Sequence, residues 1–138
     1  MIVVAIIGIL AAIAVPKFAE LIRKSNEGAT KGSMGAVRSA LSIYYADNEG
    51  QYPSDDLSSL AVSGKYLSAM PSVLAPNYHP NSAIVENNDD WGMGSMAFTD
   101  DGRWLYWNWT MGLSPRGKGD IWLACTHTDT KGNRWTTY

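Results

Sequence analysis

The sequence is poor in the residues that build catalytic and metal centres. It contains one cysteine, Cys125, which cannot form an internal disulfide and is too few for a zinc cluster. It contains two histidines, His79 and His127, and no serine or cysteine stands with either of them in a recognisable nucleophile motif. We therefore expect no catalytic residue, no metal site and no cofactor, and we expect that the protein is not an enzyme. Cys125 is expected to be a small buried residue and both histidines to lie in loops or on the surface.

Positive charge is also scarce. Eleven basic and 13 acidic residues among 138 leave a net charge of −2, which argues against a nucleic-acid-binding protein that works through bulk positive charge. Hydrophobic residues make up 46% of the chain and charged residues 17%, so the composition is neither disordered nor collagen-like. The length favours one domain over two.

The chain has one marked excess, an uninterrupted apolar run at its start. Residues 1–15 carry no charge and nothing more polar than Gly8, and charges begin at Lys17. Fifteen helical residues are about 22 Å long, short of the roughly 20 residues that span a bilayer. The run is therefore a spanning segment whose start lies upstream, the core of a signal peptide, or a buried core helix. Because nothing basic precedes the run, the signal peptide is the least favoured, and we expect that Met1 is an interior residue of a longer natural chain.

Beyond Pro16 the pattern becomes that of an amphipathic helix, which continues to about Asp47. Apolar residues recur at gaps of three, four and seven, as one face of a helix requires. These residues are Phe18, Leu21, Ile22, Ala29, Ala36, Val37, Ala40, Leu41 and Tyr44. Together with the apolar run they predict one helix of about 70 Å, whose bare front half must be buried in lipid or among copies of the chain. We divide the chain into an assembly or membrane helix, residues 1–48, and a globular head, residues 49–138.

The start of the head predicts a short helix followed by a loop. The helix is expected to begin at a cap on Ser54 or Asp55, to run through about Val62 and to stop at Gly64. Three prolines and an Asn-Asn-Asp-Asp run predict a loop over residues 71–90.

The last third of the chain predicts two β-hairpins. One pairs residues 95–99 with 103–110 across an Asp-Gly turn, and the other pairs 121–128 with 134–138. The expected fold class is therefore α+β, with the long N-terminal helix packed on a small C-terminal antiparallel β-sheet of about four strands.

Two segments resemble one family, the type IV pilins and type II secretion pseudopilins. MIVVAIIGILAAIAVPKF at residues 1–18 is similar to the interior of that family's N-terminal segment, and YYADNEGQYP at residues 44–53 is similar to the place where its members leave the long helix for the head. The resemblance implies a basic leader, cleavage by a prepilin peptidase, an N-methylated first residue and, a few residues later, a glutamate. Neither the cleavage site nor the glutamate can be assigned to a position in this sequence.

The resemblance also implies where the protein works and what it contacts. Family members stay in the inner membrane until the pilus assembly machinery adds them to an extracellular filament, or fimbrium, so the expected partner of the chain is itself. The expected assembly residues are Ile2, Val3, Val4, Ile6, Ile7, Ile9, Leu10, Ile13 and Val15. Gly8 and Pro16 are weak points of the helix, and with the family's support we expect residues 8–16 to lose helical structure in the filament; the alternative is a kinked but continuous helix.

Aromatic residues are concentrated in one predicted strand, which contains Trp104, Tyr106, Trp107 and Trp109. Both faces of that strand carry aromatic side chains, so one face is expected to cover the long helix. The other is expected to be an interface between subunits or an exposed patch. Stacking on nucleic-acid bases is not expected, because it usually requires a basic groove.

A calcium ion in the head is the one alternative to the absence of a cofactor. In the family, major pseudopilins often hold calcium in a C-terminal loop where many pilins form a disulfide. The candidate ligands lack the spacing of a calcium loop, and turns favour aspartate for other reasons. The candidate calcium ligands are Asp89, Asp90, Asp100, Asp101, Asp120 and Asp129.

The favoured function is a structural subunit that polymerises into a type IV pilus or a pilus-like extracellular filament through bundled N-terminal helices. A type II secretion pseudopilin is the first alternative. A minor pilin that acts as a tip adhesin or a DNA receptor is the second.

Overall fold

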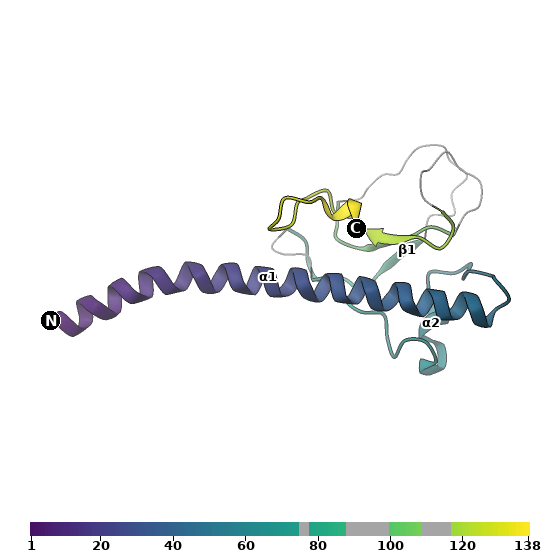
Figure 1. The fold of residues 1–138 in the computed structure, drawn as a ribbon, viewed down its shortest axis with the longest axis horizontal. Coiled ribbons are helices and arrows are strands. Elements are labelled where there is room, and N and C mark those ends of the chain that lie inside the picture. Colours follow the sequence, from purple (N-terminus) through teal and green to yellow (C-terminus); the bar gives the residue numbers. More distant parts are fainter. Residues whose placement is uncertain (75–77, 88–99, 109–116) are drawn as a thin grey trace.

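The computed structural model describes residues 1–74, 78–87, 100–108 and 117–138. Its dominant element is α1 (Ile2–Asp47), one continuous 46-residue helix (Figure 1). At 1.5 Å per residue α1 is about 69 Å long, as the sequence pattern predicted. The other helices and strands lie along its C-terminal half, and its N-terminal half projects beyond them.

α1 ends where Asn48 binds the carbonyl oxygen of Tyr44 twice. The backbone N–H of Asn48 donates to this oxygen at 3.0 Å and its Nδ2 donates at 2.9 Å. Glu49 and Gly50 then adopt positive φ angles of 51° and 82°, and the chain turns away from the helix axis. The helix therefore ends inside the YYADNEGQYP segment, where the resemblance to pilins placed its end.

A short helical segment follows, as predicted. It consists of α2 (Ser58–Ala61) and a 3-10 turn, η1 (Val62–Gly64). The N-cap is Leu57 and not the predicted Ser54 or Asp55, although the Asp55 carboxylate accepts the backbone N–H of Ser59 at 2.9 Å in the first turn. Gly64, with a φ of 63°, ends the segment at the predicted stop.

Three short strands form a mixed sheet in the order β1-β2-β3. They are β1 (Val85–Asn87), β2 (Trp104–Tyr106) and β3 (Ile121–Leu123). β1 pairs parallel with β2, and β2 pairs antiparallel with β3. The α+β fold class, a long N-terminal helix followed by a small sheet, is confirmed.

The number and direction of the strands differ from the prediction. β1 lies inside residues 71–90, which were predicted to be a loop, and it is parallel to its neighbour where only antiparallel pairs were expected. Because β1 is three residues long, it gives no periodic signal that could outweigh the nearby prolines, and only its pairing with β2 makes it a strand. The predicted strand over residues 95–99 lies outside the described residues.

The final predicted strand, residues 134–138, was wrong. Its central residues form a 3-10 helix, η2 (Trp135–Thr137), and one antiparallel bridge joins Thr128 to Arg134. The side chain of Asp129 accepts two backbone N–H groups of the intervening turn, each at 2.9 Å. This local turn draws the chain away from an extended ladder.

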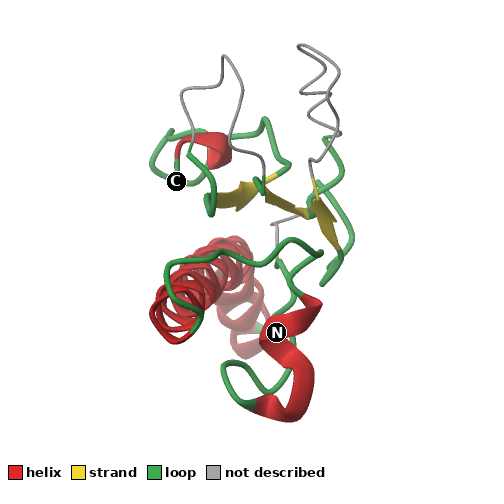
Figure 2. Ribbon diagram, turned by 90° about the vertical axis from the view of Figure 1, so that its right-hand side faces the viewer, coloured by secondary structure: helices red, strands yellow, loops and turns green. Residues whose placement is uncertain are grey.

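The core lies between α1 and the sheet, and Figure 2 shows the sheet across one side of the long helix. Trp104 and Tyr106 of β2 are fully buried there, and each donates a 2.8 Å hydrogen bond, to the carbonyl oxygens of Pro71 and Pro53 respectively. Burial raises the pKa of Tyr106, which therefore stays a neutral donor. The buried members of the core are Met34, Val37, Ala40, Leu41, Leu57, Leu60, Val73, Trp104, Tyr106, Ile121, Leu123, Cys125 and Trp135.

Candidate assembly surface

The front of α1, through Val15, is apolar on all sides and contributes no residue to the core. The nine expected assembly residues are between 52% and 78% exposed. They are Ile2, Val3, Val4, Ile6, Ile7, Ile9, Leu10, Ile13 and Val15. Because neighbouring positions point about 100° apart on a helix, this set surrounds the axis instead of forming one stripe. Among the described residues, α1 is the one helix long and apolar enough to cross a membrane.

The bare surface extends further than the sequence pattern indicated. Phe18, Leu21 and Ile22 were expected on the packed face of the amphipathic half, yet they are 59–63% exposed. The first buried residue of α1 is Glu27. Burying one side chain of the size of Ile or Leu is worth about 1.5–3 kcal/mol, so this surface holds a large unused driving force for association.

Gly8 and Pro16 lie within continuous helix in this single chain. The space around the Cα of Gly8 is open, so its lack of a side chain is not required by any contact in the described part of the chain. Pro16 has no backbone N–H, and the helix is therefore weakened one turn before it. Loss of helical structure over residues 8–16 concerns the filament and stays a prediction.

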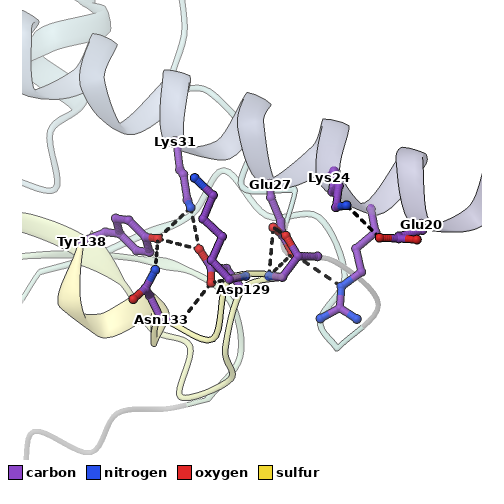
Figure 3. Close-up of polar contacts among 10 residues, drawn as sticks. Glu20, Lys24, Glu27, Lys31, Asp129, Asn133 and Tyr138 are labelled. Carbon is purple, nitrogen blue, oxygen red and sulfur yellow. Dashed lines mark hydrogen bonds and ion pairs between the residues drawn. The ribbon is translucent and has the colours of Figure 1, made fainter.

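A polar clamp joins the middle of α1 to the C-terminal turn of the head (Figure 3). Glu27 is almost fully buried, and its carboxylate accepts the backbone N–H of Thr130 at 3.0 Å and the Thr130 hydroxyl at 2.6 Å. Arg23 lies on the preceding turn of α1, with its Nε 3.5 Å from the same carboxylate. The buried charge is therefore paired on one side and hydrogen-bonded on the other.

One turn further along α1, Lys31 completes the clamp. Its Nζ donates to the carboxylate of Asp129 and to the hydroxyl of Tyr138, each at 2.7 Å. The Tyr138 hydroxyl in turn donates to Asp129. Burial would raise the pKa of Asp129, but these two donors and the backbone N–H groups of the turn outweigh it and lower that pKa well below its usual range. The end of the chain is thus fixed to α1 beside the place where the bare surface begins.

The aromatic strand is mainly a core element. Trp104 and Tyr106 are fully buried against α1, so of the four aromatic residues these two lie on the face that covers the helix and are not available to an interface. Trp107 is half-buried and packs with Leu105 and Trp122 on the opposite face of the sheet. Trp109 lies outside the described residues. Alternation along the strand indicated the two faces, but it could not show that the face carrying Trp104 is the one that covers the helix.

The aspartates considered for calcium have separate partners. Asp101 pairs with Arg103 at 2.8 Å, Asp120 accepts the N–H of Gly117 at 2.9 Å, and Asp129 belongs to the clamp. In the described parts of the chain no three of these aspartates lie together as ligands. Asp89 and Asp90 lie outside the described residues.

Asp100 instead lies in a cluster that the sequence did not predict. His79, Asp100, Cys125 and His127 place their ligand atoms within 4.8 Å of one another. The four residues come from the loop before β1, the turn before β2 and the segment after β3. The one signal in the sequence is the spacing of Cys125 and His127, since residues two apart in an extended segment share a side. Nothing in the sequence brings His79 and Asp100 to them.

Comparison with known proteins supports the resemblance to pilins. Over 73 residues the chain is 38% identical to the fimbrial protein EcpC of Eikenella corrodens. The resemblance to pilins is confirmed. The match covers 51% of this chain and 47% of EcpC, so the chain spans about half the length of the curated relative it matches. No family model matches the chain, and no solved structure matches it significantly.

Proposed function

We propose that the chain is a structural subunit that polymerises into a type IV pilus or a pilus-like extracellular filament through bundled α1 helices. The observation that carries the proposal is the front half of α1, which projects beyond the head with apolar side chains on every side. The similarity to a fimbrial protein supports the same function.

The route to the filament follows from the same surface. A helix that is apolar all round avoids water only in lipid or in contact with other apolar helices. The subunit is held in the inner membrane by α1 and then moves into the centre of a growing bundle, where neighbouring α1 helices replace the lipid. Head-to-tail contacts between identical chains that do not close into a ring extend without limit, which gives a fibre. Prepilin peptidase and the pilus assembly machinery are the partners that the resemblance implies for these steps.

Gly8 and Pro16 have a place in this proposal. When helices crowd together at a fibre axis, a segment that costs little to unwind lets the chain adjust its length and direction. Residues 8–16 are that segment, because glycine disfavours helix by about 1 kcal/mol and proline by about 3 kcal/mol relative to alanine.

A fibre assay with matched variants tests the proposal. Ile9 and Val62 are both 63% exposed, the first on the bare half of α1 and the second on the head. In the native host, Ile9→Glu should reduce the yield of sheared surface fibres at least about tenfold, because a charged side chain at the centre of a membrane-spanning helix costs roughly 2.5–3.5 kcal/mol. Val62→Glu should leave the yield unchanged.

Other outcomes of this assay point to the other functions. Loss of protein export, with surface fibres unaltered, would assign the chain to a secretion pseudopilus. Fibres that contain the chain only in trace amounts would make it a minor subunit. Equal fibre yield from both variants would overturn the proposal that α1 drives assembly.

A further inference from the structure

The side chains of His79, Asp100, Cys125 and His127 form a compact group on the head. His79 Nε2 lies 3.2 Å from an Oδ1 oxygen of Asp100, and His127 Nδ1 lies 3.5 Å from the same oxygen. The Sγ atom of Cys125 lies 3.6 Å from His127 Nδ1.

These separations are the edges of a tetrahedron of metal ligands. With zinc bonds of about 2.0–2.3 Å, neighbouring ligand atoms of a tetrahedral site are about 3.3–3.8 Å apart. The three measured edges fall in or beside that interval, and all the ligand atoms lie within 4.8 Å of one another. A small inward movement of the side chains would therefore suffice to complete the site.

His79 provides an independent indication that something is missing from this group. Its side chain is 8% exposed, and its buried Nε2 atom makes no hydrogen bond, although it lies 3.2 Å from Asp100 Oδ1. A bound cation would give this buried nitrogen a partner. The backbone of Gly102 packs closely against His79: a Cβ atom at position 102 would lie only 2.7 Å from the His79 Cβ.

The remaining ligands are held in place as well. The Asp100 carboxylate accepts the backbone N–H and the hydroxyl of Thr126, each at 2.9 Å, which orients it toward the histidines. The ring of His127 stacks on Tyr78 with centroids 3.9 Å apart. Asp100 and His127 side chains are about one-third exposed, so an ion can enter from solvent.

We propose that His79, Asp100, Cys125 and His127 bind one Zn²⁺ ion. Two imidazole nitrogens, one thiolate and one carboxylate suit zinc, whereas calcium prefers an all-oxygen set. As the Zn–S bond forms, the Cys125 thiol gives its proton to water. The ion ties together three segments that are remote in the sequence, and it stabilises the head without any covalent cross-link.

Zinc binding can be measured on the full chain in detergent micelles, after dialysis against a chelator and then into chelator-free buffer. We expect saturable uptake of one Zn²⁺ per chain and a melting temperature of the head that rises with free zinc. With Co²⁺ as a probe, a thiolate-to-metal charge-transfer absorption should appear and should be absent from Cys125→Ser.

Matched variants separate this site from adventitious binding. His127→Gln and Asp100→Asn remove ligands, so each should weaken zinc binding by more than the roughly 10- to 100-fold effect typical of lost outer-shell contacts. Asp101→Asn, a neighbouring carboxylate outside the cluster, should bind zinc as the unmodified chain does. In excess chelator the His127→Gln variant should melt like the unmodified chain, which verifies that it folds.

Absence of saturable zinc uptake by a folded chain would overturn the proposal, as would equal binding by His127→Gln and the unmodified chain. These outcomes leave the filament proposal untouched, because the measurement is made on dispersed chains and involves no residue of the assembly surface.

Discussion

Both halves of α1 are regular helix, but the rear half lies against the head and the front half is exposed. In the rear half, Val37 and Leu41 are at most 3% exposed beneath the sheet, while in the front half Val15 and Leu10 are 66% and 62% exposed. The rear half buries a narrow strip of residues, and the front half carries apolar residues in every direction. The rear half therefore packs one strip against its own head, whereas the front half finds no such cover within the chain.

The largest expected difference between the halves is in the stability of the head. Leu41→Ala should lower its free energy of unfolding by about 2–5 kcal/mol, because the substitution leaves a cavity in the core. Leu10→Ala should change it by no more than about 0.5 kcal/mol. All six tryptophans lie in residues 91–135, so urea titration of the full chain in micelles, followed by tryptophan fluorescence, reports on the head. Equal losses in the two variants would contradict the division of α1.

The second-largest loss in the free energy of unfolding is expected from changes to the clamp. Glu27→Ala leaves the backbone N–H of Thr130 without its acceptor and Arg23 without its partner, so we expect a loss of about 1–3 kcal/mol in the same titration. Glu27→Gln keeps one acceptor oxygen and should recover part of this loss. If the alanine variant is as stable as the unmodified chain, the clamp does not hold the C-terminal turn.

The long helix and its bare surface could be predicted because their signals are local. The uncharged residues 1–15 predict the bare surface, and the periodic spacing predicts the burial of Val37, Ala40 and Leu41, although it also predicted burial of Ala29 and Ala36, which are exposed. The clamp could not be predicted, since Glu27 and Thr130 are 103 residues apart and only the fold brings them together. The same holds for β1, which becomes a strand through its parallel pairing with β2, and for His79 in the four-residue cluster.

Acid should weaken the clamp through Asp129. The folded-state pKa of this residue is lowered, so the unfolded chain takes up the proton first and the head loses stability as the pH falls below about 4. Above that pH the contribution of Asp129 is complete. In urea titrations between pH 6 and pH 2.5, the midpoint of the unmodified chain should fall more steeply than that of Asp129→Asn. Parallel curves would show that Asp129 is not the source of this acid sensitivity.

The smallest effect should come from the exposed part of α1. Glu20 and Lys24 form a solvent-exposed pair with a 2.7 Å contact four residues apart. Such pairs contribute about 0.3 kcal/mol, so Glu20→Gln should barely move the urea midpoint, in contrast to Glu27→Ala. A loss comparable to that of Glu27→Ala would mean that the head is supported much further forward than Glu27.

Thiol labelling of assembled fibres tests most directly whether the front half of α1 is buried among its copies. Single cysteines at position 9 (Ile9→Cys) and position 62 (Val62→Cys), in a Cys125→Ser background, start from equal exposure in the single chain. In intact sheared fibres a water-soluble maleimide should label position 62 and spare position 9, and after the fibres are dissolved in denaturant it should label both. Rapid labelling of position 9 in intact fibres would contradict the account.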